Sequence, residues 1–150
     1  MKLTAQQIES IAKEIHEDYR KGNPGSRYDI TWESLPEDIR QANRDQAIEF
    51  MGYINILGLT VTSDIENPDC IRQLTDEQIE TVARQIHEVW IKSKVAAGWR
   101  YGPVRDDGKK IHPMLIPYAE LSESERDKDR VIARSIAAIL KRQKLVLRHT

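Results

Sequence analysis

The chain of 150 residues has a single cysteine, Cys70, so no internal disulfide bond can form and a reducing compartment, the cytoplasm, is expected. It has no apolar run near the ~18 residues that a membrane span needs. Its first residues, Met1 to Gln7, also lack the apolar segment of a signal peptide. We therefore expect neither a channel nor secretion by that route, and no membrane partner.

The sequence also lacks an excess of either charge. Its 23 basic and 24 acidic residues give a net charge of −1. This balance gives no electrostatic reason to expect a nucleic acid polymer or an anionic membrane as the main partner. With 39% apolar and 31% charged residues, the composition is typical of a soluble globular protein, as one domain or as two small halves that share a core.

Two stretches of the chain, Leu3–Lys21 and Leu74–Lys92, have closely similar sequences at an offset of 71 positions. Ten of their nineteen positions are identical, which indicates an internal duplication. Apolar residues recur at helical spacing in both stretches, and both open with a capping-box pattern. The capping pairs are Thr4 with Gln7 and Thr75 with Gln78. We predict a helix over each stretch.

A second match, at an offset of 86, relates the next helix of each half: Leu35, Arg40, Arg44 and Ala47 align with Leu121, Arg126, Arg130 and Ala133. In the first half we predict a helix that ends at Gly58 and buries Ile39, Ala42, Ala47, Phe50, Tyr53, Ile54 and Leu57. Its counterpart starts with a Ser122 and Glu125 cap and buries Ile132, Ile136, Ile139 and Leu140. Each half ends in a short extended run, Leu59–Val61 and Leu145–Leu147, and the two runs can pair as a ribbon.

The expected fold is therefore mainly α. We predict two pseudo-symmetric helix-loop-helix repeats that share one core, with short β segments at the repeat ends. The first repeat covers residues 1–66 and the second residues 67–150, in one compact unit, with the turn-rich residues 62–73 as the linker.

The two offsets differ by 15 residues, and this excess is a loop in the second half. The first half passes between its helices through a short turn-rich link at residues 22–26, whereas the second half uses Gly98–Pro117. The longer loop combines aromatic residues, both signs of charge, glycine and proline, so it cannot be a regular helix. Helix packing alone does not account for it.

Rare residue types recur in order through this part of the chain. They are HEVW from His87, GWRYGPVRDD from Gly98, Lys110, His112-Pro113, Leu115, Pro117-Tyr118, Leu121 and the helix with Arg130. This pattern resembles the ryanodine-receptor (RyR) domain family, in its free-standing bacterial or phage type, and Leu3–Val61 resembles a degenerate repeat without the loop. The resemblance implies a mainly helical module with short strands. It implies nothing about calcium conduction.

The resemblance also implies a ligand. In the large calcium-release channels, paired repeats of this family are associated with an adenine nucleotide between them, flanked by tryptophans of the Gly-Trp motif. In this sequence Trp99 alone matches that position, since the first half has no such loop.

The residue types of the loop leave two interpretations open. Trp99, Tyr101 and Trp32 can stack against a planar ligand, or they can anchor the loop as ordinary hydrophobic contacts. Arg105, Lys109, Lys110 and His112 can contact phosphate. Alternatively, Asp106 and Asp107 pair with neighbouring cations and cap loop amides, so that the charges fix the loop internally. The run from Gly102 to Lys110 superficially resembles a phosphate-binding P-loop but lacks its glycine spacing, its Ser or Thr and its preceding strand.

Other candidate chemistry is sparse. His16 and His87 occupy equivalent positions beside the apolar faces of their helices, with no further metal ligands at helical spacing, so we predict a structural hydrogen bond for each. The sequence has no nucleophile elbow and no obvious Cys–His signature. We therefore expect no catalytic residue, no metal and no cofactor other than a possible nucleotide ligand.

The sequence thus predicts a non-enzymatic protein that binds a small polar or nucleotide-like ligand in the cleft beside the Gly98–Pro117 loop. The alternative is a protein–protein interaction or scaffold module with the loop as its docking surface. A hydrolase or transferase is a third, weaker interpretation. The predicted ligand-binding residues are Trp99, Tyr101, Arg105, Asp107, Lys110, His112 and Trp32.

Overall fold

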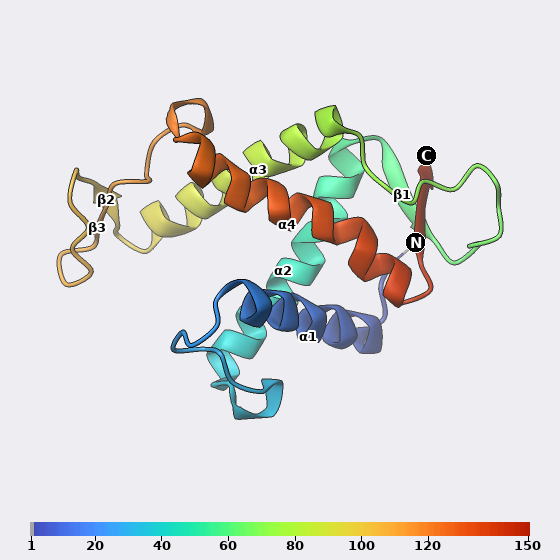
Figure 1. The fold of residues 1–150 in the computed structure, drawn as a ribbon, viewed down its shortest axis with the longest axis horizontal. Helices are drawn as coiled ribbons and strands as arrows, with labels where there is room; N and C mark the ends of the chain where they lie inside the picture. The colour runs from blue at the N-terminus through green and yellow to red at the C-terminus, as the bar shows by residue number, and fades with distance from the viewer. Residues whose placement is uncertain (1) are drawn as a thin grey trace. The chain divides into compact units, whose positions relative to one another are not determined.

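A computed structural model describes residues 2–150, and this part of the chain is mainly helical (Figure 1). The α-helices are α1 (Ala5–Gly22), α2 (Glu37–Ile56), α3 (Asp76–Ala96) and α4 (Glu123–Arg142). Two short 3-10 helices, η1 (Trp32–Ser34) and η2 (Tyr118–Glu120), precede α2 and α4. The strands are β1 (Leu59–Thr62), β2 (Arg100–Tyr101), β3 (Ile111–His112) and β4 (Val146–His149). The predicted class, mainly α with short strands, is confirmed.

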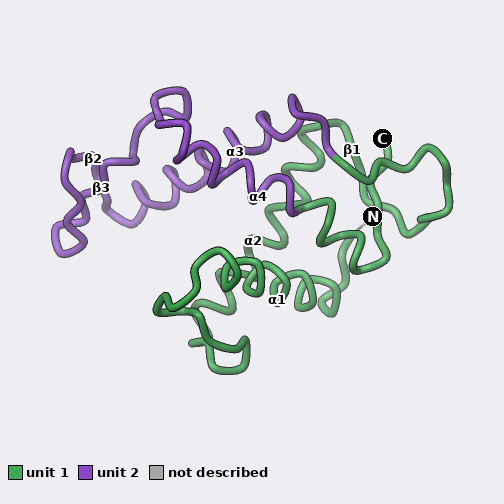
Figure 2. Tube along the Cα trace, viewed as in Figure 1, with its two compact units in different colours: residues 1–73, 136–150 green, residues 74–135 purple. Residues whose placement is uncertain are grey.

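The chain divides into two compact units, shown in two colours in Figure 2. Unit 1 contains the residues up to Gln73 together with Ile136–Thr150, and unit 2 is Leu74–Ser135. Helix α4 therefore begins in unit 2 and ends in unit 1. The Gly98–Pro117 loop lies wholly within unit 2.

The predicted helix starts are present in both units. Thr4 Oγ1 accepts a hydrogen bond from the Gln7 amide at 3.1 Å, and Gln7 Oε1 accepts one from the Thr4 amide at 2.9 Å. Thr75 and Gln78 make the same pair of bonds at the same distances. The capping boxes are therefore confirmed, and they satisfy amides that a helix start leaves without intrahelical partners.

In unit 1, α1 packs against α2, and β1 pairs antiparallel with β4, with Val61 opposite Leu147. The predicted ribbon is confirmed. The end of α2 is also as expected, since Gly58 follows it with a φ of +73°, a left-handed conformation that suits glycine. Ala42 was predicted to be buried and is exposed. It lies about 140° around the helix from the buried Ala47, so it faces solvent.

In unit 2, α3 buries one apolar stripe, made of Ile79, Val82, Ala83 and Ile86. Ala83 packs with Tyr118 and Leu121, which follow the loop, and Met114 and Ile116 pack against this cluster. The equivalent cluster of unit 1 is Ala12, Trp32 and Leu35. In both units, therefore, the segment before the second helix is pinned to the first helix by apolar contacts.

Gly52 gives a simple test of this helical frame. It is exposed in the interior of α2, and a Cβ added there meets no atom within 4 Å. Glycine in a helix interior costs roughly 0.5–1 kcal/mol relative to alanine, and Ala138 stands at the equivalent position of α4. We expect Gly52→Ala to raise the free energy of unfolding by about that amount, measured by urea titration. A fall in stability would show that something packs on this face of α2.

Candidate functional site

The Gly98–Pro117 loop folds back on itself through backbone pairing. Strands β2 and β3 run parallel, with Arg100 opposite Ile111 and Tyr101 opposite His112. Asp106 forms an additional antiparallel bridge with Ile111, in which each amide donates to the other residue's carbonyl oxygen, at 3.0 and 2.9 Å. The loop is therefore hydrogen-bonded structure of its own rather than an open connection.

The start of the loop is bound to the end of α3. Gly98 has a φ of +93°, and the amide of Trp99 donates to the Lys94 carbonyl oxygen at 2.9 Å. Lys110 reaches back across the loop, where its Nζ donates to the carbonyl oxygen of Ala97 at 2.8 Å. Lys110 itself adopts a φ of +57°, which is uncommon for a residue with a side chain. This lysine, a predicted phosphate contact, thus also caps the C-terminal end of α3.

The two acids of the loop have the local roles that the sequence suggested. Asp106 Oδ1 accepts a hydrogen bond from the Lys109 amide at 3.1 Å, so its predicted capping of a loop amide is confirmed. Asp107 accepts one from Arg105 at 2.7 Å, and this bond is the main reason that the pKa of Asp107 is lowered. Both partners of that pair are more than half exposed, so an anionic ligand can compete with Asp107 for the guanidinium.

Aromatic rings from the helix and the loop meet at His112. The ring centroid of His112 lies 4.9 Å from that of Trp90 in an edge-to-face arrangement and 6.1 Å from that of Trp99. Lys94 Nζ stands 4.5 Å from the Trp99 ring centroid and 6.0 Å from that of Trp90, within cation–π range. Trp99 is partly exposed, so part of its surface is open to a ligand.

His112 is held in one tautomer. Its Nδ1 accepts a hydrogen bond from the Met114 amide at 3.1 Å, so the proton of the neutral ring is on Nε2. Burial lowers the pKa of His112, and the positive charges of Arg105 and Lys94 lower it further. At neutral pH this ring is therefore uncharged and offers an N–H donor rather than a positive charge.

The remaining predicted ligand residues differ in accessibility. Tyr101 is 57% exposed, and Val104, which is near it in the sequence, is 75% exposed. Trp32 lies in unit 1 and is only 7% exposed, within the Ala12 and Leu35 cluster. The structure thus brings Trp99 and His112 into contact and Arg105 and Asp107 into a pair. A ligand role for Trp32 stays a prediction.

The equivalent histidines each make the predicted structural hydrogen bond. His87 Nε2 lies 2.7 Å from the carbonyl oxygen of Ile116, at the end of the loop, and His16 Nε2 lies 2.6 Å from that of Ile30. A carbonyl oxygen only accepts, so each Nε2 is the donor. His87 also stacks on Trp90, with ring centroids 5.6 Å apart, which connects this bond to the aromatic cluster.

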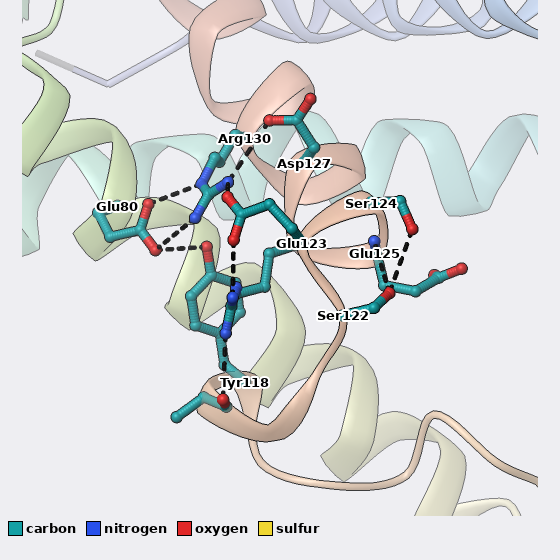
Figure 3. Close-up of polar contacts among 10 residues, drawn as sticks. Glu80, Tyr118, Ser122, Glu123, Ser124, Glu125, Asp127 and Arg130 are labelled. Carbon is teal, nitrogen blue, oxygen red and sulfur yellow. Dashed lines mark hydrogen bonds and ion pairs between the residues drawn. The ribbon is translucent and has the colours of Figure 1, made fainter.

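A polar network fixes the segment after the loop to α3, as Figure 3 shows. Arg130 donates to both oxygens of Glu80, at 2.8 and 3.3 Å, and also bonds to Glu123. The Tyr118 hydroxyl donates to Glu80 at 2.7 Å, and its burial together with this bond raises the pKa of Tyr118 to about 12. These contacts attach the segment that follows the loop to α3. The Arg130 side chain is only 16% exposed.

The same network occurs in unit 1 at the offsets of the sequence match. Arg44 donates to both oxygens of Glu9, at 2.6 and 3.3 Å, and to Glu37 at 2.7 Å. The sequence comparison paired the two arginines but gave them no partners. The sequence does contain a signal for these partners, because Glu9 and Glu80 are among the identical positions of the first match.

Sequence reasoning also missed Lys94 and Asp129. Lys94 is in the last turn of α3, where the sequence alone predicts a solvent-exposed lysine. Asp129 Oδ2 lies 3.9 Å from His87 Nδ1, and its side chain is 18% exposed, although the surrounding sequence is strongly charged. Within residues 2–150, no group of three or more His, Cys, Asp or Glu side chains is placed to hold a metal ion. None of the helices in this described part has the length and apolar character of a membrane span.

These features define a mainly helical module whose second unit carries a self-paired loop with an aromatic cluster at its base. The family model of the RyR domain matches residues 70–148, slightly more than half of the chain. The match includes all of α3, the loop and α4. The chain therefore belongs to the RyR domain family.

Proposed function

We propose that unit 2 binds a small anionic ligand of nucleotide type against the Trp99 side of its loop, as a binding module without catalytic activity. The observation that carries the proposal is a concentration of positive charge in the segment that contains the partly exposed Trp99, with Lys94 beside its ring. Residues 94–112 contain five lysines and arginines against two aspartates, whereas the whole chain has a net charge of −1. Cations grouped beside an aromatic ring suit a ligand with a planar base and a phosphate.

The roles of the residues follow from their surroundings. Trp99 offers a ring face for stacking, with Lys94 already 4.5 Å from its centroid. Arg105 can exchange its exposed bond to Asp107 for a bidentate bond to phosphate. His112 supplies a neutral Nε2–H donor, and Tyr101, which is 57% exposed, has a free ring surface at the loop.

Isothermal titration calorimetry with ATP, ADP-ribose and cyclic nucleotides tests this function. Stacking on an aromatic ring contributes ~1–3 kcal/mol per base, so we expect Trp99→Ala to weaken binding by roughly 5- to 150-fold. Arg105→Ala is expected to weaken binding of the phosphorylated ligands in particular. Arg27→Ala is the matched control, because Arg27 is an exposed cation beside a ring, Tyr28, in unit 1. Absence of heat with every ligand, or an unchanged Kd in Trp99→Ala, contradicts the proposal.

A second candidate function is protein docking through the loop, and the exposure of Val104 favours it. At 75% exposure Val104 is the most exposed of the large apolar side chains of the described residues, and Tyr101 is close to it in sequence. Affinity capture from the native host, followed by direct binding of the purified partner, tests this function. Val104→Ser should then abolish partner binding and leave nucleotide titrations unchanged. The reverse result favours the small ligand.

We also propose that residues 3–61 are a degenerate RyR repeat, that the two repeats are pseudo-symmetric copies, and that the protein is a cytoplasmic, free-standing bacterial or phage member of the family. The recurrence of the Arg–Glu network, the histidine–carbonyl bond and the apolar cluster in both units supports the duplication. The single cysteine supports a reducing compartment. Fractionation of the native host with an antibody to this chain would report its location and its full length.

A further inference from the structure

His87 has a different neighbour on each side of its ring. Its Nε2 donates to the Ile116 carbonyl oxygen at 2.7 Å, and its Nδ1 lies 3.9 Å from Asp129 Oδ2. Both side chains are largely removed from water, at 6% and 18% exposure. Because Nε2 carries a proton to reach the carbonyl, Nδ1 of the neutral ring has only a lone pair to present to the carboxyl group.

One proton can reside on either group. On the carboxyl group it gives a neutral pair, and on Nδ1 it gives an ion pair, and in either case the bond to Ile116 is kept. Burial raises the pKa of Asp129 to about 6, His87 and Lys128 lower it, and Glu125 raises it. These are the charged groups facing Asp129 from α3 and α4, and the Tyr118 ring of η2 lies 6.4 Å from His87.

Unit 1 contains the same histidine bond without a carboxyl group at the position of Asp129. The carboxyl group of Asp29 does interact electrostatically with His16, but its pKa is lowered, mainly by a hydrogen bond from the Gly25 amide, so it stays ionised over the pH range compared here. His16 donates to the Ile30 carbonyl oxygen at 2.6 Å. The offset of 86 that relates Arg44 to Arg130 places Asn43 at the position of Asp129. An amide does not ionise, so the chain contains its own comparison for the His87 site.

We propose that His87 and Asp129 share one proton, and that loss of this proton above the mildly acidic range weakens the attachment of the loop at Ile116. With the proton present, Nδ1 and the carboxyl group attract each other. Without it, a largely buried carboxylate faces a lone pair, which is unfavourable in a site of low dielectric constant. The effect extends toward the aromatic cluster, because His87 stacks on Trp90 at 5.6 Å and Trp90 contacts His112 at 4.9 Å.

Hydrogen exchange followed by mass spectrometry on the full chain, without ligand, tests this inference. After correction for the intrinsic pH dependence of exchange, we expect peptides from residues 99–118 to be about fourfold better protected at pH 5.5 than at pH 7.5, because a carboxyl group with a pKa of about 6 is mostly protonated at the lower pH and ionised at the higher one. Peptides from residues 23–35, which contain the His16 partner, serve as the internal control and should show no such change. Asp129→Asn should abolish the difference in the loop.

A loop whose corrected protection has the same pH profile in the wild type and in Asp129→Asn overturns the proposal. Should that variant not fold, carbon and nitrogen NMR of the wild-type chain decides the question. We expect the Asp129 carboxyl carbon and the His87 Nδ1 to report one common midpoint, with Nε2 protonated throughout. Separate, independent midpoints overturn the shared proton. Neither measurement uses a nucleotide, so the outcome is independent of the proposed function.

Discussion

Replacing Gly102 by alanine is expected to disrupt the loop while the helices stay folded. Gly102 follows β2 and is buried, and a Cβ added there would lie 2.2 Å from Cγ2 of Ile111. Ile111 is β-branched and paired in β3, so its methyl group cannot move away without breaking that pairing. Overpacking of this kind costs typically about 1–3 kcal/mol. A two-residue strand pair with one added bridge cannot absorb that cost, so we expect the loop to open.

The measurement is hydrogen exchange of residues 99–118, with far-ultraviolet circular dichroism to check that the helices remain. Gly108→Ala is the matched control in the same loop, because its added Cβ would meet Asp106 Oδ1 at an ordinary 3.5 Å. We expect lost protection in Gly102→Ala, near wild-type protection in Gly108→Ala, and weaker nucleotide binding in the first variant alone. Equal behaviour of the two variants would mean that the contact with Ile111 does not shape the loop.

The helices could be predicted from the sequence because local and long-range signals agree. The capping residues, the 3.6-residue period of apolar positions and the terminating Gly58 all act within one or two turns. The pairing of β1 with β4 was also within reach, since both runs end a repeat and consist of strand-forming residues. The prediction for Ala42 failed because a helical period tolerates one misplaced small residue without losing its pattern.

The internal pairing of the loop could not be predicted. Strands β2 and β3 contain two residues each, too few for any alternation of apolar and polar positions to appear. Their parallel register depends on the chain reversal through Lys110, which has a positive φ although it is not glycine. In this loop a lysine occupies a conformation that usually favours glycine or asparagine, which its residue type does not reveal.

The sequence proposed candidate site residues in the loop but none on α3 or α4. Trp90 continues the helical spacing of apolar residues in Leu74–Lys92, and its ring also packs on His112. Lys94, four residues later, lies on the same helix face. Both residues could have been predicted as neighbours of the loop if the loop had been expected to fold back over the last turns of α3. Asp129 stands in a run of charged residues that is typical of a solvated helix. Its burial follows from the position of His87 on α3, which a single sequence does not reveal.

The pH dependence of stability offers the second large effect, and its sign follows from Asp129. Burial raises the pKa of this carboxyl group from 3.8 to about 6. The folded state therefore binds the proton more tightly than the unfolded state does. The resulting stabilisation is complete below about pH 4 and is lost as the pH rises through 6. The two pKa values differ by about 2 units, so the free energy of unfolding should fall by about 3 kcal/mol at most across this window.

Asp129→Asn removes the ionisable group and is expected to remove this slope. Urea unfolding of both proteins between pH 4 and pH 8 gives the difference in free energy at each pH, and that difference cancels the other titrating groups. The free energy of unfolding of the variant, relative to that of the wild type, should increase from pH 4 upward. The variant should be the more stable protein at pH 7.5. Asp127→Asn, which removes an exposed carboxylate from the same helix, controls for the change in net charge. If Asp129→Asn instead loses stability relative to the wild type as the pH rises, the ionised carboxylate supports the fold, and burial is not what governs this group.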